Sequence, residues 1–437
     1  MFAHYLDLSW RSFKRTPLVS SLMVIAIAIG IGITMTSLSV YHMMSMDPIP
    51  HKSAKLFHPQ LRTMDEGSQL WTSDNFPLQF TYQDAMNLMN APLPERKTAS
   101  MRSGFSVHLN TAELKPFTEN TRLVGKDFFA MFEREFVYGG VWTDAQEEGA
   151  APVAIISESL NDKLFGGENS VGKSLFLDSD SFQIVGVVKE WRTHVKYYDL
   201  NNGAFNDPER LFIPFSLVAA REINNWGNTN GWKFEKSDTF KDKLQSEKFW
   251  IQFWAELPDE QAKQEYGAYL MAYMEEQQKL GRFNRKELAY KLNDVNAWME
   301  YNKVVSEDNK ILVALSFMFL AVCLANILGL LLAKFLRRAP EVGVRRALGA
   351  SKRQVFYQHI VEVSMLGLFG GVLGILVAQI GLFGVRQTQD YYNNLATMDW
   401  SMLLAAPSIA IVACVVAGLY PAWLVCRTTP ATYLKSQ

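Results

Sequence analysis

One short stretch separates two long apolar segments of this chain: residues 341–351, which read Glu-Val-Gly-Val-Arg-Arg-Ala-Leu-Gly-Ala-Ser. Its two adjacent arginines indicate a loop on the cytoplasmic face of a membrane, because loops rich in Lys and Arg stay inside. The Ala-Leu pair favours a helix, Gly349 is typical of a helix end, and Ser351 with Gln354 forms a capping box for the next helix. The stretch therefore predicts a short rigid helix at a membrane surface, although charge alone is equally consistent with a loop that only sets topology.

Four apolar segments are each long enough to cross a bilayer, and we place them at residues 18–42, 309–335, 356–386 and 402–426. Basic residues flank the amino terminus, the loop between the second and third segments, and the carboxyl terminus. The positive-inside rule then places both termini in the cytoplasm. The cytoplasmic parts are an amphipathic segment at 1–17, the loop at 336–355 and a tail at 427–437, and the outer parts are 43–308 and a short loop at 387–401.

Composition and motifs argue against several kinds of function. The 437 residues carry a formal net charge of −1, which gives no reason to expect a nucleic-acid partner. The sequence has neither a zinc-protease HExxH motif nor a Gly-x-Ser-x-Gly nucleophile elbow, so we expect no catalytic residue, no metal site and no cofactor. All three cysteines lie in or beside the apolar segments, so the outer domain is expected to fold without disulfides.

The outer region has the pattern of an α/β domain. Strands are predicted at residues 56–63, 99–110, 248–256 and 287–292, with helices at 81–89 and 259–281. The 248–256 strand alternates between two sets of side chains, which predicts a half-buried strand. Two strand-helix-strand units, at 43–117 and 246–308, would then form one split subdomain around a β-rich insertion at 118–245. The predicted fold class is an α-helical membrane protein of four spanning helices with a large α/β domain inserted between the first and second.

Small and polar residues inside the apolar segments predict close helix packing. Small residues at spacing four let membrane helices approach, and they include the glycines Gly30, Gly32, Gly367, Gly371 and Gly374. The polar side chain of Asn326 is costly in lipid, so it is expected to face another helix. These positions are predicted to serve helix packing or a dimer interface.

A Walker A pattern at residues 167–174 is interpreted as a turn. A phosphate-binding loop follows a strand and opens a helix, whereas here a helix at 158–165 is predicted before the pattern and strands over 175–188 after it. Gly167 and Gly172 are expected to supply backbone conformations with positive φ.

Several motifs resemble one family of membrane proteins. The 341–351 run is similar to the signature of the MacB/FtsX-type permeases of ABC transporters. The outer domain resembles the MacB-type periplasmic core in Val124-Gly-Lys-Asp-Phe-Phe129, Gly139-Gly-Val-Trp142, Pro152-Val-Ala-Ile-Ile-Ser157 and Val185-Gly-Val-Val188, and the chain closes with the family-like Gly418-Leu-Tyr-Pro-Ala422. The resemblance touches every part of the chain except about 192–245, where only Leu211–Pro214 matches.

The resemblance implies a function in which the chain itself is not an enzyme. It implies an inner-membrane permease of a type VII ABC transporter, with no ATPase fused to it. Such a permease couples ATP hydrolysis by a separate cytoplasmic subunit to movement of the periplasmic domain (mechanotransmission).

The resemblance also implies which residues couple to the ATPase: Glu341, Val342, Gly343, Arg345, Arg346, Ala347, Leu348 and Gly349. Of these, Val342, Ala347 and Leu348 would enter a groove of the ATPase, and the arginines would meet acidic residues or lipid phosphate. Other implied partners are a second permease, the same or different, membrane lipid, and possible periplasmic adaptor and outer-membrane duct proteins. The implied function is efflux or transfer of a peptide, drug-like or lipid-linked cargo; the alternatives are lipoprotein release by a Lol-type permease and an FtsX-like signalling transducer.

The part that the resemblance does not cover is rich in aromatic residues set among Asn and Gly. Asn and Gly indicate turns, and aromatic residues in loops are frequent binding hot spots. Trp226 and Trp232 are therefore candidate contacts for cargo or a partner. The competing interpretation, that these rings cover the insertion's own small core, has equal weight at this point.

Overall fold

The computed structural model describes residues 2–110, 114–191, 193–388 and 396–427, which form two compact units. The membrane unit contains residues 1–46 and 305–437, and the α/β unit contains residues 47–304. Residues 389–395 of the predicted 387–401 loop and residues 428–437 of the predicted 427–437 tail lie outside the described residues.

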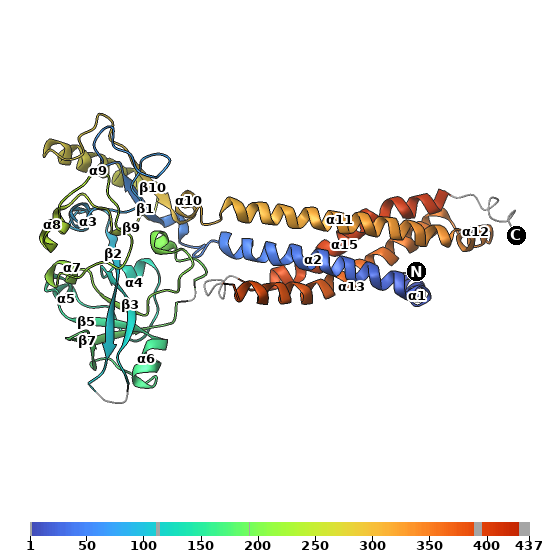
Figure 1. Cartoon of the computed structure of the whole chain (residues 1–437), viewed down its shortest axis with the longest axis horizontal. Coiled ribbons are helices and arrows are strands. Elements are labelled where there is room, and N and C mark those ends of the chain that lie inside the picture. The colour runs from blue at the N-terminus through green and yellow to red at the C-terminus, as the bar shows by residue number, and fades with distance from the viewer. Residues whose placement is uncertain (1, 111–113, 192, 389–395, 428–437) are drawn as a thin grey trace. The chain divides into compact units, whose positions relative to one another are not determined.

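The membrane unit is helical (Figure 1). Its described helices are α1 (Phe2–Arg15), α2 (Pro17–Ser45), α11 (Glu307–Arg337), α12 (Ala339–Ala347), α13 (Lys352–Arg386) and α15 (Trp400–Arg427). Among the described residues, α2, α11, α13 and α15 are long and apolar enough to cross a membrane. The chain is therefore a membrane protein of four spanning helices, with a large α/β domain inserted between the first and second, as the sequence predicts.

Glycine allows the spanning helices to approach closely within one chain. A Cβ atom built on Gly32 of α2 would lie 2.4 Å from Val377 of α13, and one on Gly371 of α13 would lie 2.6 Å from the backbone of Pro407 in α15. Gly30, Gly367 and Gly374 are similarly crowded by Leu320, Ile411 and Ile31. A larger residue at any of these positions would force a neighbouring side chain or helix backbone to shift, so these glycines allow close packing inside the chain.

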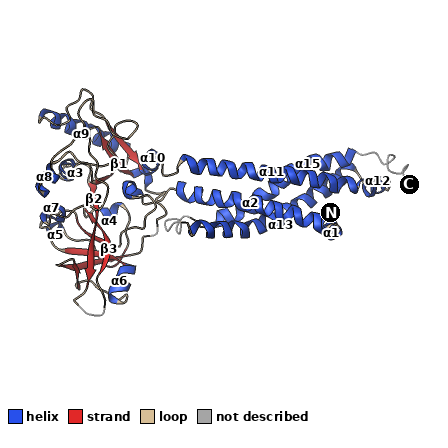
Figure 2. Ribbon diagram, in the orientation of Figure 1, coloured by secondary structure: helices blue, strands red, loops and turns tan. Residues whose placement is uncertain are grey.

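Ten strands of the described α/β residues form one sheet (Figure 2), in the order β10-β1-β9-β2-β3-β8-β5-β7-β4 with β6 beside β2 and β7. The strands are β1 (Leu56–Leu61), β2 (Arg96–His108), β3 (Phe117–Val124), β4 (Phe136–Gly139), β5 (Val153–Ser157), β6 (Ser174–Leu177), β7 (Asp180–Val188), β8 (Leu211–Pro214), β9 (Gln252–Glu256) and β10 (Tyr290–Asp294). The helices are α3 (Tyr82–Met89), α4 (Phe128–Met131), α5 (Asp144–Glu148), α6 (Glu158–Phe165), α7 (Leu217–Ala220), α8 (Phe240–Gln245), α9 (Glu260–Lys279) and α10 (Val295–Tyr301), with 3-10 turns η1 (Ser53–Lys55) and η2 (Tyr197–Asn202).

Long strand β2 joins the two predicted subdomains into one sheet. Its first part, Arg96–Ser100, pairs antiparallel with β9, and its later part, Ser100–Val107, pairs antiparallel with β3. One apolar core contains Phe57 and Phe253 from the predicted split subdomain together with Ile184 from the predicted insertion. The subdomains therefore share a sheet and a core.

The prediction of a half-buried strand at 248–256 is wrong. Phe253 and Ala255 of β9 lie in one apolar core, and Trp254 lies in a second core with Val124 and Ile155. Because β9 lies between β1 and β2, its alternating side chains enter two different cores, and both faces of the strand are buried.

Buried charges also hold the α/β unit together. Arg122 on β3 is fully buried and donates hydrogen bonds of 2.8 and 3.0 Å to Glu209, and it also pairs with Asp199. Lys196 donates to Glu209 at 2.5 Å. Burial would raise the pKa of Glu209, but Arg122 and Lys196 outweigh burial and hold that pKa well below its ordinary value.

The Walker-like run is a turn, as predicted. Helix α6 precedes it and β6 follows, and both Gly167 and Gly172 have positive φ, at 84° and 87°. Lys173 lies 3.7 Å from the carboxylate of Glu168. The order of elements is the reverse of a phosphate-binding loop.

Candidate functional site

Helix α12 lies between two spanning helices and is bounded by clear local signals. Pro340 occupies its first turn, and the chain leaves it through Gly349, whose φ of +102° favours glycine. Ser351 then caps α13 and forms the predicted capping box with Gln354. The loop therefore consists of one short helix and one tight turn before α13 begins. This regular structure defines which side of α12 each side chain occupies.

The two faces of α12 differ in exposure. Val342 and Gly343 are buried, and Val342 packs in the apolar core of the membrane unit. Val344 is 49% exposed and Leu348 is 84% exposed, and Ala347 is exposed beside them. The expectation that Val342 enters a groove on the ATPase is wrong for this structure, because Val342 already packs inside its own chain. Val344, one turn before Leu348, provides the outward apolar residue instead.

Charged residues of α12 connect it to neighbouring helices. Arg346 donates to the backbone oxygen of Cys426 in α15 at 3.3 Å, and Arg345 donates to Gln358 of α13 at 3.1 Å. Glu341 lies 3.4 Å from Arg15 of α1 in an exposed ion pair. Exposed pairs of this kind contribute little stability, so these contacts orient α12 and leave Arg345 accessible to a partner.

A buried polar cluster, which the sequence analysis missed, lies at the start of α12. The Glu362 cluster consists of Ser12, Ser20, Lys334, Arg338, His359 and Glu362. Its members come from α1, α2, α11 and α13, and Arg338 is also the residue that precedes α12. The sequence signal was present, because ionisable residues inside apolar segments are rare and mark functional positions.

Glu362 is the centre of the cluster. The ammonium group of Lys334 lies 2.8 Å from its carboxylate, Arg338 lies at 3.8 Å, and Ser12 donates a hydrogen bond to it. Arg338 in turn donates to the backbone oxygen of Ser12 at 3.2 Å, and Lys334 donates to Ser20 at 3.1 Å. The side chains of Lys334 and Glu362 are each 1% exposed, so each charge depends on the other for compensation.

The aromatic residues of the 192–245 region differ in how far they are exposed. Trp226 is 53% exposed, with its ring so close to Gly104 of β2 that a Cβ atom there would lie 2.2 Å from it. Trp232 is half-buried, with Lys233 4.8 Å from its ring centre. Tyr197 and Tyr198 of the same region are buried in a core, as the competing interpretation expects. Trp226 is thus a firmly held exposed ring, and its contact with cargo stays a prediction.

Asn326 does not make the expected contact within the chain. Its side chain is exposed on α11, and it has no hydrogen bond to another helix in the described part of the protein. The exposed neighbours of Asn326 on α11 are apolar and include Val322, whose side chain is 58% exposed. A polar amide on a surface of that kind is costly in lipid.

Comparison with protein families matches two parts of the chain. Residues 20–268 match the MacB-like periplasmic core domain, and residues 313–430 match the FtsX-like permease C-terminal domain. Among curated relatives, the macrolide export ATP-binding/permease protein MacB of Shewanella oneidensis is 24% identical over 82% of this chain and 49% of its own length. The pyoverdine export ATP-binding/permease protein PvdT of Pseudomonas fluorescens is 22% identical over 82% of this chain and 48% of its own length. The chain thus spans about half the length of the curated relatives it matches.

Two solved structures have a weak similarity to part of the chain. The periplasmic region of MacB from Actinobacillus actinomycetemcomitans is 14% identical with a TM-score of 0.37, and covers 58% of this chain and 95% of its own. The extracellular domain of the noncanonic ABC-type transporter YknZ from Gram-positive bacteria is 13% identical with a TM-score of 0.34, and covers 55% of this chain and 100% of its own. Since the core-domain match spans more than half of the sequence and the FtsX-like match covers the last three spanning helices, this chain belongs to the MacB/FtsX-type ABC transporter permeases.

Proposed function

We propose that this chain is the permease of an ABC exporter in which an ATPase pushes on α12 and thereby moves the α/β unit. The observation that carries the proposal is that α12 and its C-cap residue Leu348 have two different faces: Val342 is fixed in the membrane unit, whereas Val344 and Leu348 are apolar and exposed. An exposed apolar pair on a short, firmly held helix suits docking into a protein groove.

The proposed topology follows the positive-inside rule. Arg345 and Arg346 support a topology in which α12 and both termini are cytoplasmic, in a bacterial inner membrane, with the α/β unit in the periplasm. The names of the relatives, macrolide and pyoverdine exporters, support export as the general function. No observation on the described residues favours lipoprotein release or signalling over export. A periplasmic adaptor and an outer-membrane duct belong to the same proposal, and Trp226 and Trp232 are the proposed cargo or partner contacts.

Replacing Leu348 with aspartate is the direct test of docking. Because a charge would have to be buried in an apolar groove, Leu348→Asp and Val344→Asp are each expected to reduce ATPase co-purification at least tenfold, the effect of losing a hot spot of about 2 kcal/mol or more. Membrane insertion should be unchanged, since both side chains are exposed. The measurement is the amount of ATPase recovered with the tagged permease, and Leu280→Asp, an exposed leucine of the α/β unit, is the control. Normal recovery with both α12 variants would show that this helix does not dock.

A second permease in the complex is supported by Asn326. The exposed amide on α11 would find a hydrogen-bond partner if α11 packed against a helix of another permease. Asn326→Leu is expected to weaken permease dimerisation in nanodiscs about threefold to tenfold, the value of roughly 1 kcal/mol, whereas Asn326→Gln should retain most of it. The measurement is the monomer–dimer ratio by mass photometry at several concentrations. Equal ratios for Asn326→Leu and the unchanged protein would place the dimer interface away from this position.

A further inference from the structure

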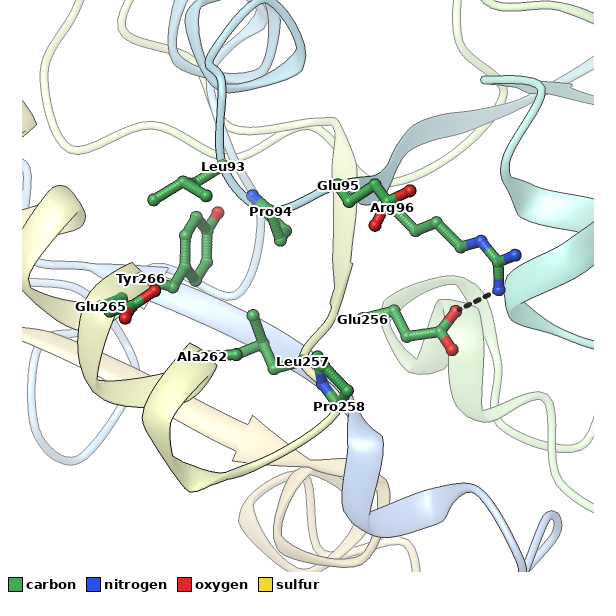
Figure 3. Close-up of a pocket in the computed structure, with 10 residues that line it drawn as sticks. All are labelled: Leu93, Pro94, Glu95, Arg96, Glu256, Leu257, Pro258, Ala262, Glu265 and Tyr266. Atoms are coloured by element: carbon green, nitrogen blue, oxygen red, sulfur yellow. Dashed lines mark ion pairs between the residues drawn. The ribbon is translucent and has the colours of Figure 1, made fainter.

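A pocket opens in the α/β unit where β2 begins and β9 ends (Figure 3). Arg96 and Glu256 are paired across these two strands, and the first turns of α9 close the other side. The cavity has a volume of about 420 Å³, within the range of about 300–1,000 Å³ that is typical of small-molecule sites. None of the residues considered above as functional lines this pocket.

The walls of the pocket are mostly apolar. They are formed by Leu93, Pro94, Leu257, Pro258, Ala262 and the ring of Tyr266. Figure 3 shows these side chains around the cavity, with Leu93, Pro94 and Tyr266 at one end and the Arg96–Glu256 ion pair at the other. Such walls favour a compact apolar body as the occupant.

One buried polar group in this wall lacks a partner. Tyr266 is 1% exposed, and its hydroxyl makes no hydrogen bond to any described residue. Burial raises the pKa of Tyr266, so the hydroxyl stays protonated and is able both to donate and to accept. A buried hydroxyl without a partner is unfavourable, and a ligand that supplies one would recover that free energy.

The charged residues of the pocket give it a negative balance. Glu95, Glu256 and Glu265 line it together with a single guanidinium, that of Arg96. Glu256 is paired with Arg96 at 3.7 Å and with Lys52 at 3.2 Å. Glu265 accepts a hydrogen bond of 2.9 Å from the neutral Gln261, and neither Glu265 nor Glu95 has a described ion-pair partner. The rim therefore favours a positively charged group.

We propose that this pocket binds a small organic cation: a compact apolar body that carries a hydrogen-bonding group for the Tyr266 hydroxyl and an ammonium group for the acidic rim. This inference goes beyond the proposed function, because it concerns only the α/β unit and does not depend on an ATPase or on α12.

Tyramine is the probe that combines these features, and its analogues each remove one of them. Phenethylamine lacks the phenol hydroxyl, tyrosol lacks the charge, and 4-hydroxyphenylacetate reverses it. By calorimetry on the full chain in detergent, we expect tyramine to bind about fivefold more tightly than phenethylamine and than tyrosol, and 4-hydroxyphenylacetate to bind most weakly.

Variants assign each difference to a group in the pocket. Tyr266→Phe should bind tyramine and phenethylamine equally, whereas Tyr269→Phe, which changes the neighbouring stacked ring outside the pocket, should keep their difference. The double variant Glu95→Gln with Glu265→Gln should bind tyramine and tyrosol equally. Ala262→Phe should fill the cavity and abolish binding. Thermal unfolding of each variant confirms that it is folded.

The proposal has clear failing outcomes. Absence of tyramine binding at up to about 10 mM, a threshold of roughly −3 kcal/mol, would overturn it. Unchanged binding by a folded Ala262→Phe variant would place any bound amine outside this pocket. If Tyr266→Phe keeps the full preference for tyramine over phenethylamine, the assigned hydrogen bond does not exist.

Discussion

Glu362→Gln is expected to destabilise the membrane unit by about 3–5 kcal/mol and to loosen the start of α12 against the spanning helices. Glutamine keeps the shape of the side chain but removes the carboxylate that lies 2.8 Å from Lys334 and 3.8 Å from Arg338. The ammonium group of Lys334 would then stay buried without its counter-ion, and loss of one member of a buried ion pair is costly. Because Arg338 is the N-cap residue that immediately precedes α12, the variant also loosens the start of that helix.

Two measurements separate stability from coupling. The first is thermal unfolding of the full chain in nanodiscs, where Glu307→Gln is the matched control, since Glu307 makes an exposed ion pair with Lys310 on the same helix. The second is the ATP-dependent change in distance between spectroscopic labels on the α/β unit, in a complex with the ATPase. We expect Glu362→Gln to lower the unfolding temperature and to reduce the ATP-dependent change in distance. Glu307→Gln should change neither quantity.

The double variant Lys334→Met with Glu362→Leu tests the physical explanation. Replacing both charges with apolar residues removes the uncompensated ion, and such replacements are often neutral or stabilising. Thermal stability should therefore return, while the ATP-dependent movement stays reduced because Arg338 still lacks its carboxylate. A Glu362→Gln variant with normal stability and normal movement would mean that the cluster neither holds the helices together nor transmits motion.

Arg122→Met is expected to have a comparable effect on the α/β unit and to lower its free energy of unfolding by about 3–5 kcal/mol. Methionine leaves the buried carboxylates of Asp199 and Glu209 with neutral hydrogen-bond donors and with Lys196 as the remaining cation paired with Glu209 among the described residues. For a unit of this size the loss corresponds to a melting temperature lower by roughly 6–20 °C. Arg221→Met, which removes a partly exposed pair with Asp180, is the control and should cost less than about 1 kcal/mol.

The pH dependence of stability gives an independent check on this pair. In the folded unit the pKa of Glu209 lies well below its ordinary value of 4.5. The ionised Glu209 side chain therefore contributes its full stabilisation above pH 4.5, and this stabilisation is lost as the pH falls below that value. Arg122→Met should raise this pKa and flatten the acid side of the stability profile. If Arg122→Met unfolds at the same temperature as Arg221→Met, and with the same pH profile as the unchanged protein, the buried ion pair contributes no more to stability than the partly exposed pair.

Local structure was predictable where the signal lies within a few residues. The turn at Gly349, the capping box of Ser351 with Gln354 and the positive φ of Gly167 and Gly172 all follow from short-range backbone chemistry. The spanning helices were predictable for a related reason, since a continuous apolar run has few other stable structures. The resemblance to one family was carried by motifs of the same local kind.

Contacts between distant residues were not predictable in this way. Val342 and Val344 are chemically alike and two positions apart, and only the packing of α12 on the membrane unit decides which of them is buried. The same holds for β9, whose alternation was visible in the sequence but whose second buried face requires the core around Trp254. Asn326 was predicted to face another helix, but its side chain is exposed within the single chain.

The sequence by itself determined the class of protein, the four spanning segments and the position of the short helix between two of them, because these depend on composition and on neighbouring residues. Only the tertiary structure decided which face of α12 is free, which charges meet at Glu362 and which walls enclose Tyr266. Glu362 lies 28 positions from Lys334 and 350 from Ser12, and Tyr266 is separated from Leu93 by much of the α/β unit. Pairings over such separations are set by the free energy of burying the whole chain, and no local pattern of residues encodes them.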